Sequence, residues 1–379
     1  WRQMVRPLAV GTMVVGAAWT LFKMRSSLGT AFGRVFADLR SVKVVETPDR
    51  HETDLPYKYI AFGILGLLIP IIAIYYYFSQ SIGGSIVAAL VMVIAGILFA
   101  AVAGYLVGVI GSSNNPISGL TLSTLILAAL LMVAIGLTGQ HGVAAVLGVA
   151  AVVCCAMGIA GDMMQDLKVG HILGGTPASM EKGEMIAVVA AAPALAVVLA
   201  LLDKAYGFGS AMLPAPQAGL MALVSQGIVG GEMTWPLFLA GMLLAVMLIL
   251  VRTPSVMLVA VGMYLPIWST FAIFIGGVIR WIVDRQLERR RYSEAAKERA
   301  ANTGILLASG MVAGEALTGV IIAGVIVAGL KLPVLVSSPV ARGLIGLLVF
   351  PIVLWIFSRF SNKEARSVHQ EPEPLPTGR

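Results

Sequence analysis

The sequence has few charged residues and only two cysteines. Asp, Glu, Lys and Arg make up 12% of its 379 residues, whereas 58% are hydrophobic and the mean hydropathy is +0.92. A soluble domain of this size could not cover its surface with so few polar residues. Cys154 and Cys155 are neighbours within an apolar block, which excludes a disulfide framework. The composition therefore excludes soluble globular proteins and disulfide-stabilised secreted domains.

The apolar residues are arranged in blocks of about 20 residues, the length that a helix needs to cross a hydrocarbon core of about 30 Å. The chain is therefore predicted to be an all-α polytopic integral membrane protein with about eleven transmembrane helices, internal repeats and broken helices. The expected spans are 7–22, 59–78, 85–110, 117–137, 143–161, 185–202, 213–231, 235–251, 256–279, 303–330 and 341–358.

The net charge of +7 is concentrated in three places. Seven Lys/Arg lie between Lys23 and Lys58, seven between Arg280 and Arg299, and four follow Phe357. By the positive-inside rule these segments are cytoplasmic, and nucleic-acid binding is not expected. All three fall on one side if 213–231 is a full crossing rather than a re-entrant hairpin. The N-terminus is then outside and the C-terminus is inside.

Three regions follow from this layout. Residues 1–58 hold the first span and a basic cytoplasmic loop, 59–358 form the main transmembrane domain, and 359–379 are expected to be a disordered cytoplasmic tail. The chain has no starting Met and enters a span at once, so it is interpreted as part of a longer protein. The expected location is the plasma membrane, which is the inner membrane in bacteria.

A polar break, "GSSNNPISGLT", follows the long apolar block 85–110. Asn115 is predicted to be the N-cap and Pro116 the first residue of a new helix. The N–H groups at the start of that helix suit an anionic group. Asn114, Asn115, Pro116 and Gly119 are therefore candidate substrate-binding residues. An ordinary polar turn between two spans explains the motif equally well.

A second polar motif, "GDMMQDLKVGHILGGTP", follows the expected span 143–161. Asp162 and Asp166 are four residues apart and share a helix face, with Gln165, Lys168 and His171 close by. Such a group suits a cation, a peptide amine or a proton. A solvated loop with a local ion pair is the alternative. The spacing matches no standard metal-ligand motif, and no metal or other cofactor is expected.

Two segments, 227–241 and 310–324, are identical at six aligned positions in the pattern G-x-V-x-G-E-x7-A-G. Each carries one glutamate, Glu232 or Glu315. A carboxylate within a span usually faces the bundle interior or a watery cavity, and transporters often build their site from repeats. Both glutamates are therefore candidates for binding substrate or a proton. A loop position for Glu232 and a chance match remain open.

The stretches "NNPISGLT", "GDMMQDLKVGHILGGTP", "LPAPQAGLMALVSQGIVGG" and "LASGMVAGEALTG" together resemble the oligopeptide transporter family, most of all its prokaryotic and yellow-stripe-like branch. The resemblance runs from about residue 60 to 358. It implies roughly sixteen spans in the complete protein, secondary active uptake driven by protons, and small peptides or peptide-like metal chelates as substrates. The "KIPPR" stretch of the eukaryotic peptide branch is absent from the chain, which weakens the case for peptide specificity.

The function expected from the sequence is proton-coupled peptide transport. A carrier of metal–nicotianamine or siderophore-type chelates is the alternative. A channel would use the same polar breaks without accumulating its solute. An enzyme is not expected, because neither H-E-x-x-H nor G-x-S-x-G occurs. Lipid is the expected environment, and assembly into a homo-oligomer is left open.

Overall fold

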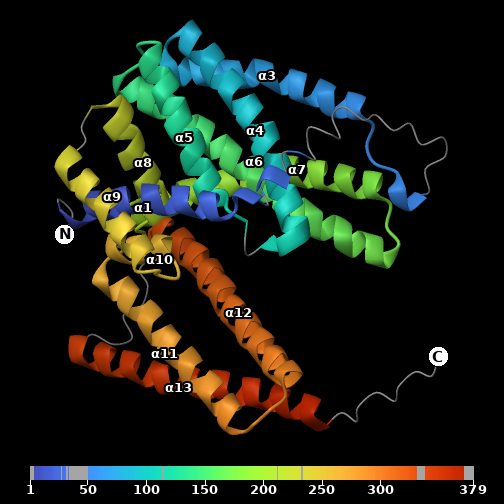
Figure 1. Ribbon diagram of the computed structural model, residues 1–379, viewed down its shortest axis with the longest axis vertical. Coiled ribbons are helices and arrows are strands. Elements are labelled where there is room, and N and C mark those ends of the chain that lie inside the picture. The colour runs from blue at the N-terminus through green and yellow to red at the C-terminus, as the bar shows by residue number, and fades with distance from the viewer. Residues whose placement is uncertain are drawn as a thin grey trace. The chain divides into compact units, whose positions relative to one another are not determined.

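The computed structural model describes residues 4–26, 28–30, 33, 50–112, 115–210, 212–231, 234–330 and 338–370. Within these ranges every regular element is a helix (Figure 1). The helices are α1 (Val5–Lys23), η1 (Arg50–Glu52), α3 (Tyr57–Ser79), α4 (Ile82–Ile110), α5 (Ile117–Ala134), α6 (Gly139–Leu173), α7 (Pro177–Tyr206), α8 (Pro216–Val229), α9 (Trp235–Leu250), α10 (Val256–Tyr264), α11 (Ile267–Arg289), α12 (Glu294–Val327) and α13 (Pro339–Gln370).

The helices form two compact units. The first unit comprises Trp1–Ala194 and Pro214–Tyr264, and the second comprises Leu195–Leu213 and Leu265–Arg379. Helix α7 begins in the first unit and ends in the second.

The first unit is built around α6, which packs along α4 and against α5 (Figure 1). Fully buried side chains from α5 and α6, among them Leu125, Ala128, Val149 and Val153, form its centre. These residues are small or branched, so they let long helices approach closely without leaving voids. The packing fixes α4, α5 and α6 relative to one another.

Helices α1 and α9 cross at a pair of glycines in the same unit. A Cβ atom on Gly11 would overlap the carbonyl oxygen of Phe238, and one on Gly241 would overlap that of Leu8. The close approach also lets Thr12 Oγ1 donate to the carbonyl oxygen of Gly241 across 2.9 Å. Small residues and an interhelical hydrogen bond are the usual means by which helices associate in lipid.

The second unit contains α11, α12 and α13, with α13 packed against both of the others (Figure 1). Gln286 of α11 joins α13 through its Oε1, which accepts from Ser358 Oγ at 2.6 Å and Asn362 Nδ2 at 3.2 Å. Ser293 begins α12, and its side chain accepts from the Ala296 N–H. The basic C-terminal ends of α11 and α13 therefore lie at the same end of this unit, as the charge distribution predicts.

Eight helices of the described ranges are long and apolar enough to cross a membrane. They are α1, α3, α4, α5, α6, α7, α12 and α13. Their length and apolar composition confirm the prediction of an all-α polytopic membrane protein. Hardly any of the apolar stretches of α3, α7, α12 and α13 is buried within the structure, so these surfaces suit contact with lipid.

The other three predicted spans are shorter or interrupted. Helix α8 has 14 residues and α9 has 16, or about 21 and 24 Å at 1.5 Å per residue. The predicted span 256–279 is divided between α10 and α11, because Pro266 lies between them. We expected 213–231 to be a full crossing, but α8, the helix in this segment, is shorter than a hydrocarbon core of about 30 Å.

The helix of the span expected at 143–161 continues as α6 to Leu173. Asp162 and Asp166 therefore lie on a helix, as predicted, and the alternative of a solvated loop is wrong. The tail expected to be disordered from residue 359 continues α13 to Gln370, and residues 371–379 lie outside the described ranges. Residues 359–370 contain no Gly or Pro that would end the helix, so the polarity of the tail was mistaken for a helix end.

Candidate functional site

The predicted break between α4 and α5 is present in the first unit. Helix α4 ends at Ile110, Gly111 adopts a positive φ of 83°, and α5 begins at Ile117. The predicted cap is wrong by one residue, since Pro116 occupies the N-cap position and no side chain caps the helix. The Ile117 N–H bonds to the carbonyl oxygen of Asn115 at 2.9 Å, so this donor is already used. Asn114 lies outside the described residues.

Gly119 and Pro116 are both buried, and they have a packing role. A Cβ atom on Gly119 would lie 3.5 Å from the side chain of Leu21. Gly119 therefore faces the segment that holds Leu21. Of the predicted residues in this motif that the structure describes, only Asn115 remains a candidate for binding.

The side chain of Asn115 is directed at α6. A Cβ atom on Gly161 would lie 3.2 Å from Asn115 Nδ2, so a glycine at this position of α6 leaves room for the amide. The Oδ1 atom of Asn115 is buried and has no hydrogen-bond partner. A buried acceptor without a partner is costly and calls for an explanation. One explanation is a bound donor that completes the site.

A second polar contact ties the break to α6. Gln165 Nε2 donates to Ser112 Oγ across 2.7 Å. The sequence had indicated Gln165 but not Ser112. This bond and the position of Asn115 hold Ser112 and Asn115 beside the second half of α6.

The polar segment 50–55 is docked on the turn that joins α6 to α7. Gly174 makes that turn with a left-handed φ of 79°. Four hydrogen bonds connect the two segments: Arg50 Nε to Thr176 Oγ1 (2.9 Å), His51 Nδ1 with the Gly175 carbonyl oxygen (3.4 Å), Ala178 N to Thr53 O (2.9 Å) and Leu55 N to Glu181 Oε2 (2.9 Å). They place Asp54 beside α6, a position that no local sequence pattern indicates.

A hollow of about 550 Å³ opens between these elements, and we call it the α6 hollow. Its volume lies within the range of roughly 300–1,000 Å³ that is usual for small-molecule sites. It is lined by Asp54, Val107, Gly108, Met164, Gln165, Leu167, Lys168, His171 and Pro177. The walls thus combine apolar surface with one carboxylate, one ammonium group, one imidazole and one amide.

The structure divides the predicted polar group on α6 into two sets. Gln165, Lys168 and His171 line the α6 hollow, but Asp166 borders a different hollow with Glu184 of α7. Residues two apart on a helix lie about 200° apart around its axis, which separates Asp166 from Lys168. The expected cluster of paired carboxylates with Lys and His is therefore not formed.

The carboxylates form an acidic group instead. The charges that act on Glu184 come from Asp166, Asp162 and Glu181, and the Oε1 atom of Glu184 is buried without a hydrogen-bond partner. In the part of the chain that the structure describes, no three His, Cys, Asp or Glu side chains lie close enough to hold a metal ion. In the sequence, Glu181 and Glu184 precede the apolar part of α7, a position that indicates a solvated role at the membrane interface.

Glu315 lies within α12 of the second unit, and its side chain is exposed there. The nearby glycines Gly310, Gly314 and Gly319 each face open space, with no atom within 4 Å of a built Cβ. They therefore do not serve as a tight packing site within this unit. Glu232 lies outside the described residues.

The two glutamate segments differ in local structure. Residues 227–241 include the end of α8, the start of α9 and the connection between them, whereas 310–324 lie wholly within α12. The sequence similarity is thus not matched by a common backbone conformation.

Comparison with known proteins identifies relatives of the chain. Residues 1–326 match a family model described as OPT oligopeptide transporter protein. The chain is 29% identical to a Haemophilus influenzae protein named "Putative oligopeptide transporter", in a match that covers 84% of this chain and 56% of that protein. The chain therefore spans about half the length of this curated relative. No solved structure matches it.

Proposed function

Because the chain belongs to the oligopeptide transporter family, we propose that the protein carrying it is a secondary active transporter that takes up small peptides with protons. The family match covers most of the chain, and the curated relative is named for the same substrate class. Eight apolar helices of spanning length agree with a transporter and leave no large soluble part among the described residues for catalysis.

The α6 hollow is the proposed peptide site, and the observation that carries this assignment is its pairing of opposite charges. A small peptide is a zwitterion with an ammonium group at one end and a carboxylate at the other. Asp54 and Lys168 both line the hollow, and neither forms an ion pair in the described ranges. They are therefore available for the two termini, while Gln165 and His171 offer hydrogen bonds to the peptide groups.

Proton coupling is assigned to a carboxylate in a membrane span. Glu315 lies in a helix of spanning length, where an ionised carboxylate is costly and is usually functional. Glu232 is the second candidate because of its related sequence setting. On this proposal, Glu315 gains a proton on the outside and releases it on the inside.

The proposed orientation follows from charge. The basic ends of α11 and α13 lie at one end of the second unit, and the positive-inside rule makes that end cytoplasmic. The C-terminus is then in the cytoplasm and the protein resides in the plasma membrane, the inner membrane of a bacterium.

Uptake into proteoliposomes tests the proposal. The natural protein that carries this chain is reconstituted with an acid-outside gradient and offered either a labelled tripeptide or a labelled metal–nicotianamine complex. We expect saturable accumulation of the tripeptide that a protonophore abolishes. Accumulation of the complex alone would assign the protein to the metal-chelate carriers, and flux that neither saturates nor exceeds equilibrium would indicate a channel.

A further inference from the structure

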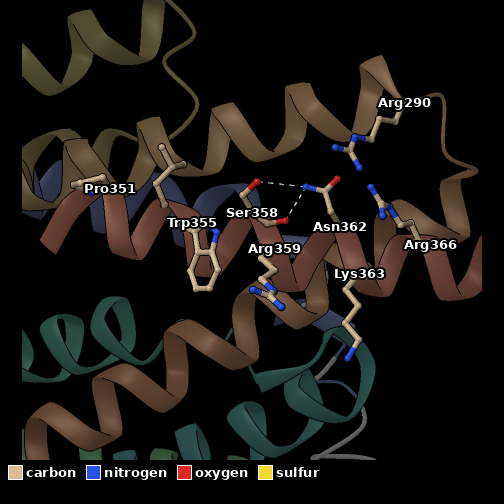
Figure 2. Close-up of a pocket in the computed structure, with 9 residues that line it drawn as sticks. Arg290, Pro351, Trp355, Ser358, Arg359, Asn362, Lys363 and Arg366 are labelled. Carbon is tan, nitrogen blue, oxygen red and sulfur yellow. Dashed lines mark hydrogen bonds between the residues drawn. The ribbon is translucent and has the colours of Figure 1, made fainter. Parts of the chain in front are cut away.

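The second unit carries a basic hollow at the end where α11 and α13 meet (Figure 2). Its volume is about 640 Å³, and its lining includes Arg290, Trp355, Arg359, Asn362, Lys363 and Arg366. This basic hollow belongs to neither the proposed peptide site nor the proposed proton carriers. Four cationic side chains, those of Arg290, Arg359, Lys363 and Arg366, line it.

The hollow is held open by a polar contact between two helices. Gln286 of α11 accepts hydrogen bonds from Ser358 and Asn362 of α13, and Asn362 Nδ2 also donates to the Ser358 carbonyl oxygen at 2.7 Å. Asn362 is 7% exposed. This buried contact keeps Arg290, at the end of α11, beside the basic turns of α13.

Among the described residues, no carboxylate forms an ion pair with the four cations of the hollow. In the described part of the chain, the ion pairs are Arg280–Asp284 and Lys297–Glu294, so none of the four cations takes part in one. Like charges gathered around one cavity repel each other and create a strongly positive potential. An anion in the hollow would remove that repulsion.

Two of these cations already converge on one oxygen atom. Figure 2 shows the guanidinium groups of Arg290 and Arg366 turned toward each other. Partial burial acts to raise the pKa of the Tyr292 phenol, but hydrogen bonds from Arg290 and Arg366 outweigh it and leave that pKa below its usual value. The two arginines thus present their donors to a single acceptor, as in sites that bind a phosphate oxygen.

The hollow lies where a helix passes from apolar to basic sequence. From Gly343 to Phe357 the sequence of α13 is apolar, and Arg359, Lys363 and Arg366 follow on successive turns. Arg359 lies over the ring of Trp355, with 4.9 Å between the guanidinium carbon and the ring centroid. Trp beside Arg and Lys is typical of the depth at which lipid headgroups lie.

We propose that this basic hollow binds the phosphate of an anionic phospholipid of the cytoplasmic leaflet, such as phosphatidylglycerol. Arg290, Lys363 and Arg366 hold the phosphate oxygens, and Trp355 packs against the glycerol end of the acyl chains. Phosphate chemistry alone would also suit a soluble phosphate, but the depth of Trp355 favours a lipid. The site would anchor α11 and α13 to the cytoplasmic leaflet.

A pair of matched variants tests this proposal. Arg359→Gln with Lys363→Gln removes two charges and one cation–ring contact from the basic hollow. Arg285→Gln with Arg289→Gln does the same on α11 outside the hollow, because Arg285 lies 5.2 Å over the Trp281 ring. Each protein, purified without lipid, is titrated with phosphatidylglycerol, phosphatidylcholine or inorganic phosphate while its melting temperature is followed.

We expect phosphatidylglycerol to stabilise the unaltered protein, with little effect of the other two additives. Its affinity should fall roughly tenfold or more in the hollow variant, because two cations near the headgroup are lost, and less than about twofold in the control. Equal losses in both variants would mean general surface attraction. Stabilisation by inorganic phosphate alone, or equally by phosphatidylcholine, would also overturn the proposal.

A second measurement decides the matter if the hollow variant does not fold. The fluorescence of Trp355 is obtained by subtracting the emission of Trp355→Phe from the emission of the unaltered protein. Phosphatidylglycerol with a spin label near its glycerol should quench this difference more strongly than spin-labelled phosphatidylcholine at the same mole fraction. Equal quenching by the two lipids would refute a site for anionic headgroups.

Discussion

Replacing Lys168 with Gln gives the sharpest test of the α6 hollow. Lys168 is exposed on the wall of the hollow, so its contact with a peptide carboxylate is partly screened by water. Such exposed ion pairs contribute up to about 1 kcal/mol, and a hydrogen bond to a charged group about 1.5–3 kcal/mol. We expect Lys168→Gln to weaken peptide binding by about 1–1.5 kcal/mol, which corresponds to a rise in KM of roughly five- to tenfold.

The assay compares a tripeptide that has a free carboxylate with the same tripeptide as its C-terminal amide. Lys168→Gln should raise KM for the free acid but change KM for the amide by less than about twofold, because the amide has no charge for Lys168 to bind. Lys182→Gln is the control, since Lys182 is an exposed lysine of α7 outside the hollow. Equal losses for acid and amide would show that Lys168 does not bind the carboxylate.

Three further predictions concern coupling, packing and charge. Glu315→Gln should abolish the pH-driven part of uptake while leaving counterflow exchange of peptide intact, and normal proton-driven uptake would remove Glu315 from this role. Gly241→Ala should lower the melting temperature and weaken the α1–α9 crossing by about 1–3 kcal/mol, because its Cβ would overlap the Leu8 carbonyl oxygen; an unchanged melting temperature would contradict that packing. The Tyr292 phenol should ionise below the usual pKa of about 10. Its phenolate therefore stabilises the folded protein at high pH, and this stabilisation is lost as the pH falls through the folded pKa. Arg366→Gln should move the phenolate absorbance titration back toward the usual pKa.

The helix positions were largely predictable because the bilayer fixes both length and composition. The predicted spans 59–78 and 85–110 lie within α3 and α4, and the break before residue 117 was located by Pro116. The error came at the tail, where the polarity after residue 358 was treated as a helix end. Hydropathy reports how deep a residue lies in the membrane, whereas a helix ends where the backbone cannot continue, as at Gly174.

The candidate site was only partly predictable. Helix periodicity alone separates Lys168 from Asp166, so the division of the polar group on α6 was available from spacing. The contribution of Asp54 was not, because it depends on contacts between residues more than 120 positions apart, such as Arg50 with Thr176. No local pattern encodes such a pairing, since it depends on how α6 and α7 are packed.

The two glutamate segments show why similar sequence need not give similar structure. In the first, Gly230 and Gly231 are adjacent, Gly231 has a positive φ of 72°, and Pro236 lies in the first turn of α9. In the second, glycines are separated and no proline occurs, so α12 continues through Glu315. A carboxylate on a continuous helix has no free backbone groups beside it, because the helix uses them for its own hydrogen bonds. Glu315 must therefore act through its side chain alone, and the two glutamates are tested for proton coupling with separate variants.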